Sequence, residues 1–203
     1  MSEIPLPSML VRRHFHVFFF ALAVFLAGGI LGTTPQRTQE IMEEAEKIEI
    51  DVYNIPENIR RIYVNNAVIG IILFIASFTV ILGANIMLNN VGVVFGAVVF
   101  NVPPLWAIVT LSSFGVLEAL SFTFIFTAGL LIPVYGVKKL VGYSDTSFVE
   151  TLSDCLWLLI YGLCLLLPAA VIEALLINPN TVLYALTSGP IITVFVVYSL
   201  LNE

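Results

Sequence analysis

Glu118 and Glu173 are the only acidic residues inside the long apolar runs of this chain. A carboxyl group in hydrocarbon is costly unless it is paired, protonated or beside a water-filled cavity, so each glutamate is a candidate for ion binding or proton transfer. Glu118 lies near the start of one run and Glu173 near the end of the next. In two antiparallel helices, both carboxyls would therefore lie toward the same leaflet.

The sequences around the two glutamates are alike, because residues 116–120 read VLEAL and residues 171–175 read VIEAL. A quasi-symmetric carboxyl pair of this kind is suited to binding a cation or sharing a proton. Two plainer interpretations stay open. Each glutamate could join helices through a hydrogen bond to a nearby hydroxyl or backbone group, or it could sit at a helix end that reaches the membrane interface.

The elements that position these residues are predicted to be membrane-spanning helices. Of the 203 residues, 59% are hydrophobic and 11% charged, and the mean hydropathy of +1.02 excludes an ordinary soluble domain and a disordered chain. A span needs about 20 apolar residues. Six runs qualify, of which the first is short and the third is interrupted: residues 17–32, 67–84, 91–113, 115–136, 155–177 and 182–201.

Charge and motif content exclude several classes of protein. The net charge of −6 and the pI near 4.8 argue against a nucleic-acid partner. The chain has no HExxH, GxSxG or GxxxxGK motif, and His14 and His16 stand too close in sequence to share a zinc ion on one helix. We therefore expect a non-enzymatic protein without cofactor or metal, embedded in the lipid bilayer of the cell membrane as a multi-pass protein.

The first run is preceded by Arg12 and Arg13, as a secretory signal would be. Residues 28–35 (GGILGTTP) contain no small-x-small cleavage site of the A-x-A type, which favours a retained anchor. Lys138 and Lys139 follow the fourth run and fall on the same side as Arg12 and Arg13 if six spans are counted. Because cytoplasmic loops are rich in Lys and Arg, both termini are predicted to be cytoplasmic, although Arg60 and Arg61 oppose this orientation.

The only large polar segment, residues 33–66, is predicted to be an acidic extramembrane helical insertion within a single membrane domain of residues 1–203. Thr34 and Pro35 form a helix start, and Asn54 with Glu57 forms a second one, so we expect two helices with a kink near Asn54. An apolar stripe at heptad spacing packs either on the protein's own surface or headgroups, or on another copy or partner protein. Its residues are Ile41, Ala45, Ile48, Val52, Ile55, Ile59 and Ile62.

The third run is broken near its centre at Asn101, Pro103 and Pro104. Prolines remove backbone donors, and freed carbonyls at membrane depth are tolerated only inside protein or beside a water-filled cavity. We favour a kinked span over a re-entrant hairpin, which would reverse every later element. Asn101 is included with Glu118 and Glu173 in the candidate intramembrane polar or ion site.

Asparagines and glycines flank the second and third runs. Asn65, Asn66 and Asn90 are expected to cap helix ends or to form hydrogen bonds between helices. Small residues spaced four apart allow close helix approach, and this pattern occurs at Gly28, Gly29, Gly32, Gly92 and Gly96.

Four short motifs in order resemble the stage II sporulation protein M family. They are residues 62–68 (IYVNNAV), 88–96 (LNNVGVVFG), 115–118 (GVLE) and 170–174 (AVIEA), and the likeness runs over nearly the whole chain. The family's His-Gly pair is Phe114-Gly115 here, and its Asn-Gly is nearest to Asn90-Val91-Gly92. The resemblance implies a polytopic membrane component that works with partners. The departure at Phe114 puts in doubt any role that the family histidine would have.

The sequence therefore predicts an all-α, polytopic transmembrane helix bundle. The first functional expectation is an assembly or scaffold component, as a homo-oligomer or with other membrane proteins. The alternative is a channel or transporter for an ion or small solute that uses Glu118 and Glu173 near the broken helix.

Overall fold

The computed structural model describes residues 4–45, 51–100, 103–143 and 146–202, and in this part of the chain every regular element is a helix. The first half comprises α1 (Pro7–Arg13), α2 (Phe15–Gly32), α3 (Pro35–Ala45), α4 (Ile55–Ala76), α5 (Val80–Ile86), the π-helical turn η1 (Met87–Gly92) and α6 (Val93–Phe100). The second half comprises α7 (Pro104–Thr110), the π-helical turn η2 (Leu111–Gly115), α8 (Val116–Leu140), α9 (Phe148–Ile177) and α10 (Val182–Asn202).

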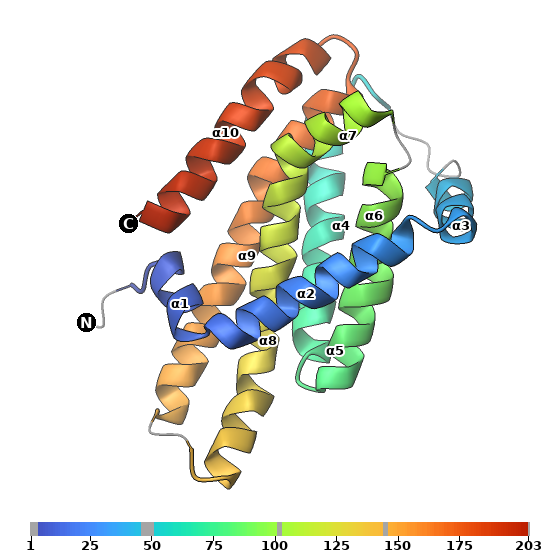
Figure 1. The fold of residues 1–203 in the computed structure, drawn as a ribbon. Helices are drawn as coiled ribbons and strands as arrows, with labels where there is room; N and C mark the ends of the chain where they lie inside the picture. Colours follow the sequence, from blue (N-terminus) through green and yellow to red (C-terminus); the bar gives the residue numbers. More distant parts are fainter. Residues whose placement is uncertain (1–3, 46–50, 101–102, 144–145, 203) are drawn as a thin grey trace.

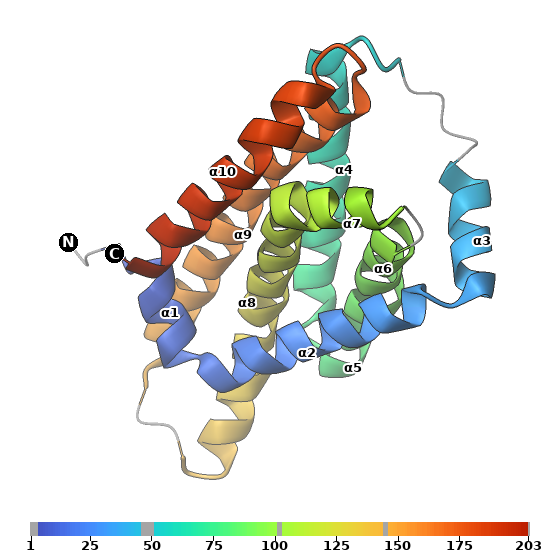
Figure 2. The same cartoon turned by 45° about the horizontal axis from the view of Figure 1, so that its top comes forward.

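Six helical stretches are long and apolar enough to cross a membrane, which confirms the predicted all-α bundle of about six hydrophobic segments. The stretches are Phe15–Gly32, Ile55–Ala76, Val80–Ala97, Trp106–Leu140, Phe148–Ile177 and Val182–Leu200. The chain is thus a multi-pass membrane protein. From α4 onward, successive long helices run in opposite directions through the bundle, and α2 crosses them obliquely (Figures 1 and 2).

The boundaries of the second, third and fourth spans differ from the prediction. The run 67–84 is divided by a turn at Ser77–Thr79, because α4 ends at Ala76 and α5 begins at Val80. The run 91–113 is neither a kinked span nor a re-entrant hairpin. Its first part completes the third span and its second part begins the fourth, with Pro103 as the N-cap and Pro104 as the first residue of α7. Proline has no N–H to leave unpaired at that position, so it starts a helix readily.

The polar segment contains the two predicted helix starts. The structure places α3 at the side of the bundle, away from α4 (Figure 2). Asn54 caps α4 by accepting a hydrogen bond from Glu57 N at 3.3 Å, and α4 then continues without a break to Ala76. Residues 55–66 therefore belong to the same helix as the start of the second apolar run, and the apolar stripe is not one continuous helix face. Ile48 lies outside the described residues.

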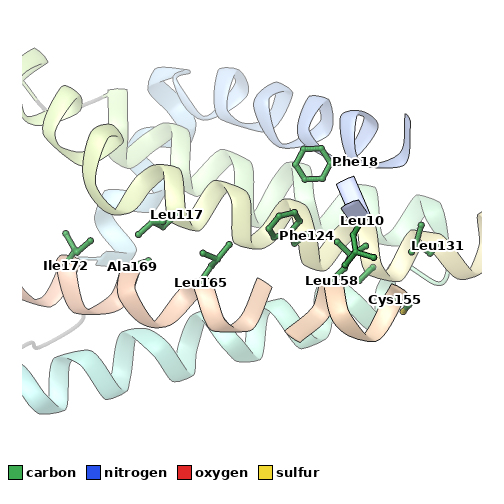
Figure 3. Close-up of a cluster of buried hydrophobic side chains, with 11 residues drawn as sticks. Leu10, Phe18, Leu117, Phe124, Leu131, Cys155, Leu158, Leu165, Ala169 and Ile172 are labelled. Carbon is green, nitrogen blue, oxygen red and sulfur yellow. The ribbon is translucent and has the colours of Figure 1, made fainter. Parts of the chain in front are cut away.

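The hairpin of α8 and α9 forms the centre of the bundle. Residues 121–131 of α8 are all buried, which requires neighbours on every side of that helix. Ser121 Oγ donates a hydrogen bond to Gly162 O at 2.7 Å, so the two helices approach closely. Figure 3 shows the shared apolar core, in which Leu117, Phe124 and Leu131 face Leu158, Leu165 and Ile172.

Glycines let α2 cross η1 and α6 at backbone contact. A Cβ atom built at Gly92 would stand 2.8 Å from Gly28 Cα, and one at Gly96 would stand 2.8 Å from Gly29 Cα. Neither position has room for a side chain. The small-residue pattern found in the sequence therefore marks a real interhelical seam between α2 and the third span.

Both ends of the described chain lie at the same end of the bundle. The last turns of α10 contact α1, and Figures 1 and 2 place the two termini close together. The start of α4 and the connection between α9 and α10 lie at the opposite end (Figure 1).

Candidate intramembrane polar site

Three helices each bring one polar side chain to the same place in the bundle. Asn66 comes from α4, Glu118 from the first turn of α8, and Glu173 from the last turns of α9. The three helices contact one another pairwise. Because α8 and α9 are antiparallel, a residue near the start of one lies beside a residue near the end of the other.

Within this group, called the Asn66–Glu118–Glu173 cluster below, Asn66 and Glu118 are in direct contact. Asn66 Nδ2 donates a hydrogen bond to Glu118 Oε1 at 2.7 Å. Glu118 and Glu173 are close enough for their charges to repel. All three side chains are partly buried. Asn65 supports the cluster from the exposed side, with its Nδ2 3.4 Å from Asn66 Oδ1.

The electrostatics of the cluster limit the charge that it can hold. Neither carboxyl forms an ion pair with a Lys or Arg among the described residues. Two neighbouring carboxylates in an apolar environment do not both ionise without a compensating charge, since like charges and burial each disfavour the ionised form. The cluster is therefore suited to keep one proton shared between two carboxyls, or to exchange that proton for a cation.

The π-helical turn η2 directly precedes α8 and connects the start of that helix, which carries Glu118, to α10. A π turn interrupts the regular hydrogen-bond ladder and is frequent at functional sites. Here the freed carbonyl of Ser113 accepts a hydrogen bond from the Thr193 hydroxyl of α10. Gly189 of α10 adds close contact, because a Cβ there would lie 3.1 Å from Ile172 Cγ2, one residue before Glu173.

Asn66 forms the predicted hydrogen bond between helices, with Glu118, but the other residues of the predicted site lie elsewhere. Asn65 is inside α4 and Asn90 is inside η1, so neither of them caps a helix end. Asn90 is exposed. Pro103 and Pro104 start α7, and Asn101 lies outside the described residues.

A second polar cluster joins the N-terminal segment to α9 and was not predicted from the sequence. The buried carboxylate of Asp154 accepts hydrogen bonds from Arg13 Nη1 at 3.0 and 2.9 Å and lies 2.8 Å from His14 Nε2. Tyr161 of α9 also donates a hydrogen bond from its hydroxyl to Pro5 O at 2.9 Å. Asp154 stands one residue before the fifth apolar run, and only that placement at a span boundary could have drawn attention to it.

No family model matches the chain, and neither a curated protein nor a solved structure shows significant similarity to it.

Proposed function

We propose that this multi-pass protein moves a proton or a small cation through the membrane and that the Asn66–Glu118–Glu173 cluster is its binding site. The observation that carries the proposal is the meeting of two intramembrane carboxyls and an amide from three different helices. Ionisable groups inside membrane bundles commonly mark proton and ion pathways. We also propose that the protein lies in the cell membrane and that it belongs to the stage II sporulation protein M family, which its motifs resemble.

The geometry favours this function over interhelical glue for one reason. One hydrogen bond between Asn66 and Glu118 would be enough to hold α4 against α8. A second carboxyl beside the first adds repulsion when both are ionised, so it weakens a purely structural contact. The second carboxyl has a function if the two carboxyls together bind and release a proton or a cation.

Reconstitution into liposomes tests the proposal. We expect purified protein to carry protons inward under an imposed membrane potential, followed by a pH-sensitive dye inside the vesicles. Glu118→Gln and Glu173→Gln should each reduce this flux at least about tenfold, because each removes a carboxyl of the pair. Glu40→Gln, on the exposed face of α3, is the matched control and should leave the flux unchanged. No flux of H⁺, Na⁺ or K⁺ by the parent protein would contradict the proposal.

A second candidate function, non-enzymatic assembly with another copy or a membrane partner, is favoured by the outer face of α10. This helix lies at the edge of the bundle (Figures 1 and 2). Pro190, Ile191, Val194, Phe195 and Tyr198 line a shallow apolar concavity of about 450 Å³ on it. A neighbouring helix packed into this concavity would bury side chains that are now exposed.

Cross-linking tests whether two copies of the protein associate through the outer face of α10. Ile191→Cys should form a disulfide-linked dimer in membranes under mild oxidation, whereas Ile81→Cys, exposed on α5, should not. Both variants are made in a background in which Cys155 and Cys164 are replaced by alanine. Equal cross-linking of the two variants, or a single-chain mass in native gels, would contradict assembly through α10.

A further inference from the structure

The short helix α1 covers a narrow apolar cleft at the end of the bundle where the termini lie. The cleft has a volume of about 140 Å³ and is partly enclosed. Apart from Ser8, its lining side chains are apolar, and four helices supply them: Ser8 and Val11 from α1, Phe18 from α2, Leu120 and Phe124 from α8, and Leu200 from α10. Figure 3 shows Phe18 close to Phe124, and their ring centroids are 5.6 Å apart.

The position of α1 over this cleft is fixed by polar contacts. Arg13 and His14 are held by the buried Asp154 of α9, and Tyr161 holds Pro5. These contacts anchor both ends of α1 to the same helix. The polar contacts therefore hold α1 in place as one wall of the cleft.

The volume and the lining restrict what the cleft can hold. Pockets for ordinary small-molecule ligands measure about 300–1,000 Å³ and contain several polar groups. The cleft is too small for a whole acyl chain, but a short stretch of one fits this volume and needs no polar groups. In a bilayer, lipid chains are the abundant apolar species that would fill such a space.

The charge next to the cleft indicates which lipid fits. Arg12 lies four residues after Ser8 and hence on a neighbouring part of the α1 surface, and it is exposed. Arg13 is engaged by Asp154, but Arg12 has no ion pair with any of the residues that the structure describes. An exposed guanidinium on the helix that forms one wall of an apolar cleft is complementary to a phosphate attached to an acyl chain.

We propose that this cleft binds a stretch of one acyl chain of an anionic phospholipid from the leaflet at the termini, with the phosphate of that lipid paired to Arg12. The lipid then joins α1, α2, α8 and α10 in one packed unit. This binding does not depend on ion movement at the Asn66–Glu118–Glu173 cluster.

Native mass spectrometry of detergent-purified protein, incubated with equal amounts of phosphatidylglycerol and phosphatidylethanolamine, tests the proposal. The parent should retain one phosphatidylglycerol per chain in preference to phosphatidylethanolamine. Val11→Trp, which fills the cleft from α1, should reduce the retained lipid at least about fivefold. Arg12→Gln leaves the cleft open, so lipid should still bind, but the preference for phosphatidylglycerol should fall about fivefold.

Two further variants complete the experiment. Leu120→Trp fills the cleft from α8 and replaces Val11→Trp if that variant does not elute as folded protein. Leu183→Trp, at an exposed position of α10 outside the cleft, is the matched control and should retain lipid as the parent does. Full retention by both cleft-filling variants, or equal retention of the two lipids by the parent, would overturn the proposal.

Discussion

At the scale of single residues, two clusters of charged and polar side chains lie toward opposite ends of the bundle. Asn66, Glu118 and Glu173 meet toward the end where α4 begins, and Asp154 gathers Arg13 and His14 toward the end where the termini lie. The sequence singled out both glutamates, because charge inside an apolar run is rare. It did not single out Asp154, because a carboxylate at the edge of a run looks like an ordinary interfacial residue.

The Asp154 cluster should control the attachment of α1. We expect Asp154→Ala to raise the rate of maleimide labelling of Leu10→Cys at least about tenfold, equivalent to ~1.4 kcal/mol, because Leu10 is fully buried and becomes reactive only when α1 lifts. Both substitutions are made with Cys155 and Cys164 replaced by alanine. Asp51→Ala, at an exposed site, is the control and should not change the rate. Equal labelling in the presence and absence of Asp154 would show that other contacts hold α1.

At the scale of elements, helix starts were predictable and the ends of spans were not. Pro35 and Asn54 mark helix starts that the structure confirms, because a proline or a cap acts locally on the backbone. The turn at Ser77–Thr79 had no such signal, since it interrupts a run that is apolar on both sides. Ser77 is the buried C-cap of α4, and a Cβ atom built at Gly129 of α8 would stand 2.5 Å from Ser77 Cβ. The turn therefore fits a tertiary contact that the sequence pattern does not encode.

The seam between α2 and the third span should tolerate no side chain at its glycines. Gly92→Leu and Gly96→Leu should each cost about 2 kcal/mol or more through overpacking and lower the thermal midpoint in detergent by about 4–8 °C. Gly136→Leu is the matched control, because a Cβ at that position of α8 has no atom within 4 Å. Equal thermal midpoints for the three variants would contradict a close backbone contact at this seam.

At the scale of the whole molecule, composition was enough to predict a multi-pass helical bundle, but not the topology of its third and fourth spans. The sequence pattern predicts that Pro103 and Pro104 break one span near its centre, whereas the two prolines lie between two spans. The local sequence shows that a helix ends at the prolines. Only the packing of α6 and α7 in the bundle shows to which span each half of the run 91–113 belongs. The correction leaves an even number of spans and both termini at one end.

The positive-inside rule predicts the orientation of the protein in the membrane. Arg12 and Arg13 precede the first span and Lys138 and Lys139 end α8, so the end of the bundle that carries the termini should face the cytoplasm. In intact cells, a membrane-impermeant maleimide should label Tyr53→Cys, which precedes α4, and should label Tyr143→Cys only after permeabilisation. The reverse pattern would place the termini outside.

We propose that Glu118 and Glu173 act as one unit, and a double-variant cycle of proton flux in liposomes is the experiment that tests this. If one proton or cation is held between the two carboxyls, Glu118→Gln, Glu173→Gln and the combined variant should lose flux to the same extent, because either change removes the shared site. Losses that multiply in the combined variant, or a single variant that keeps the parent flux, would contradict the account.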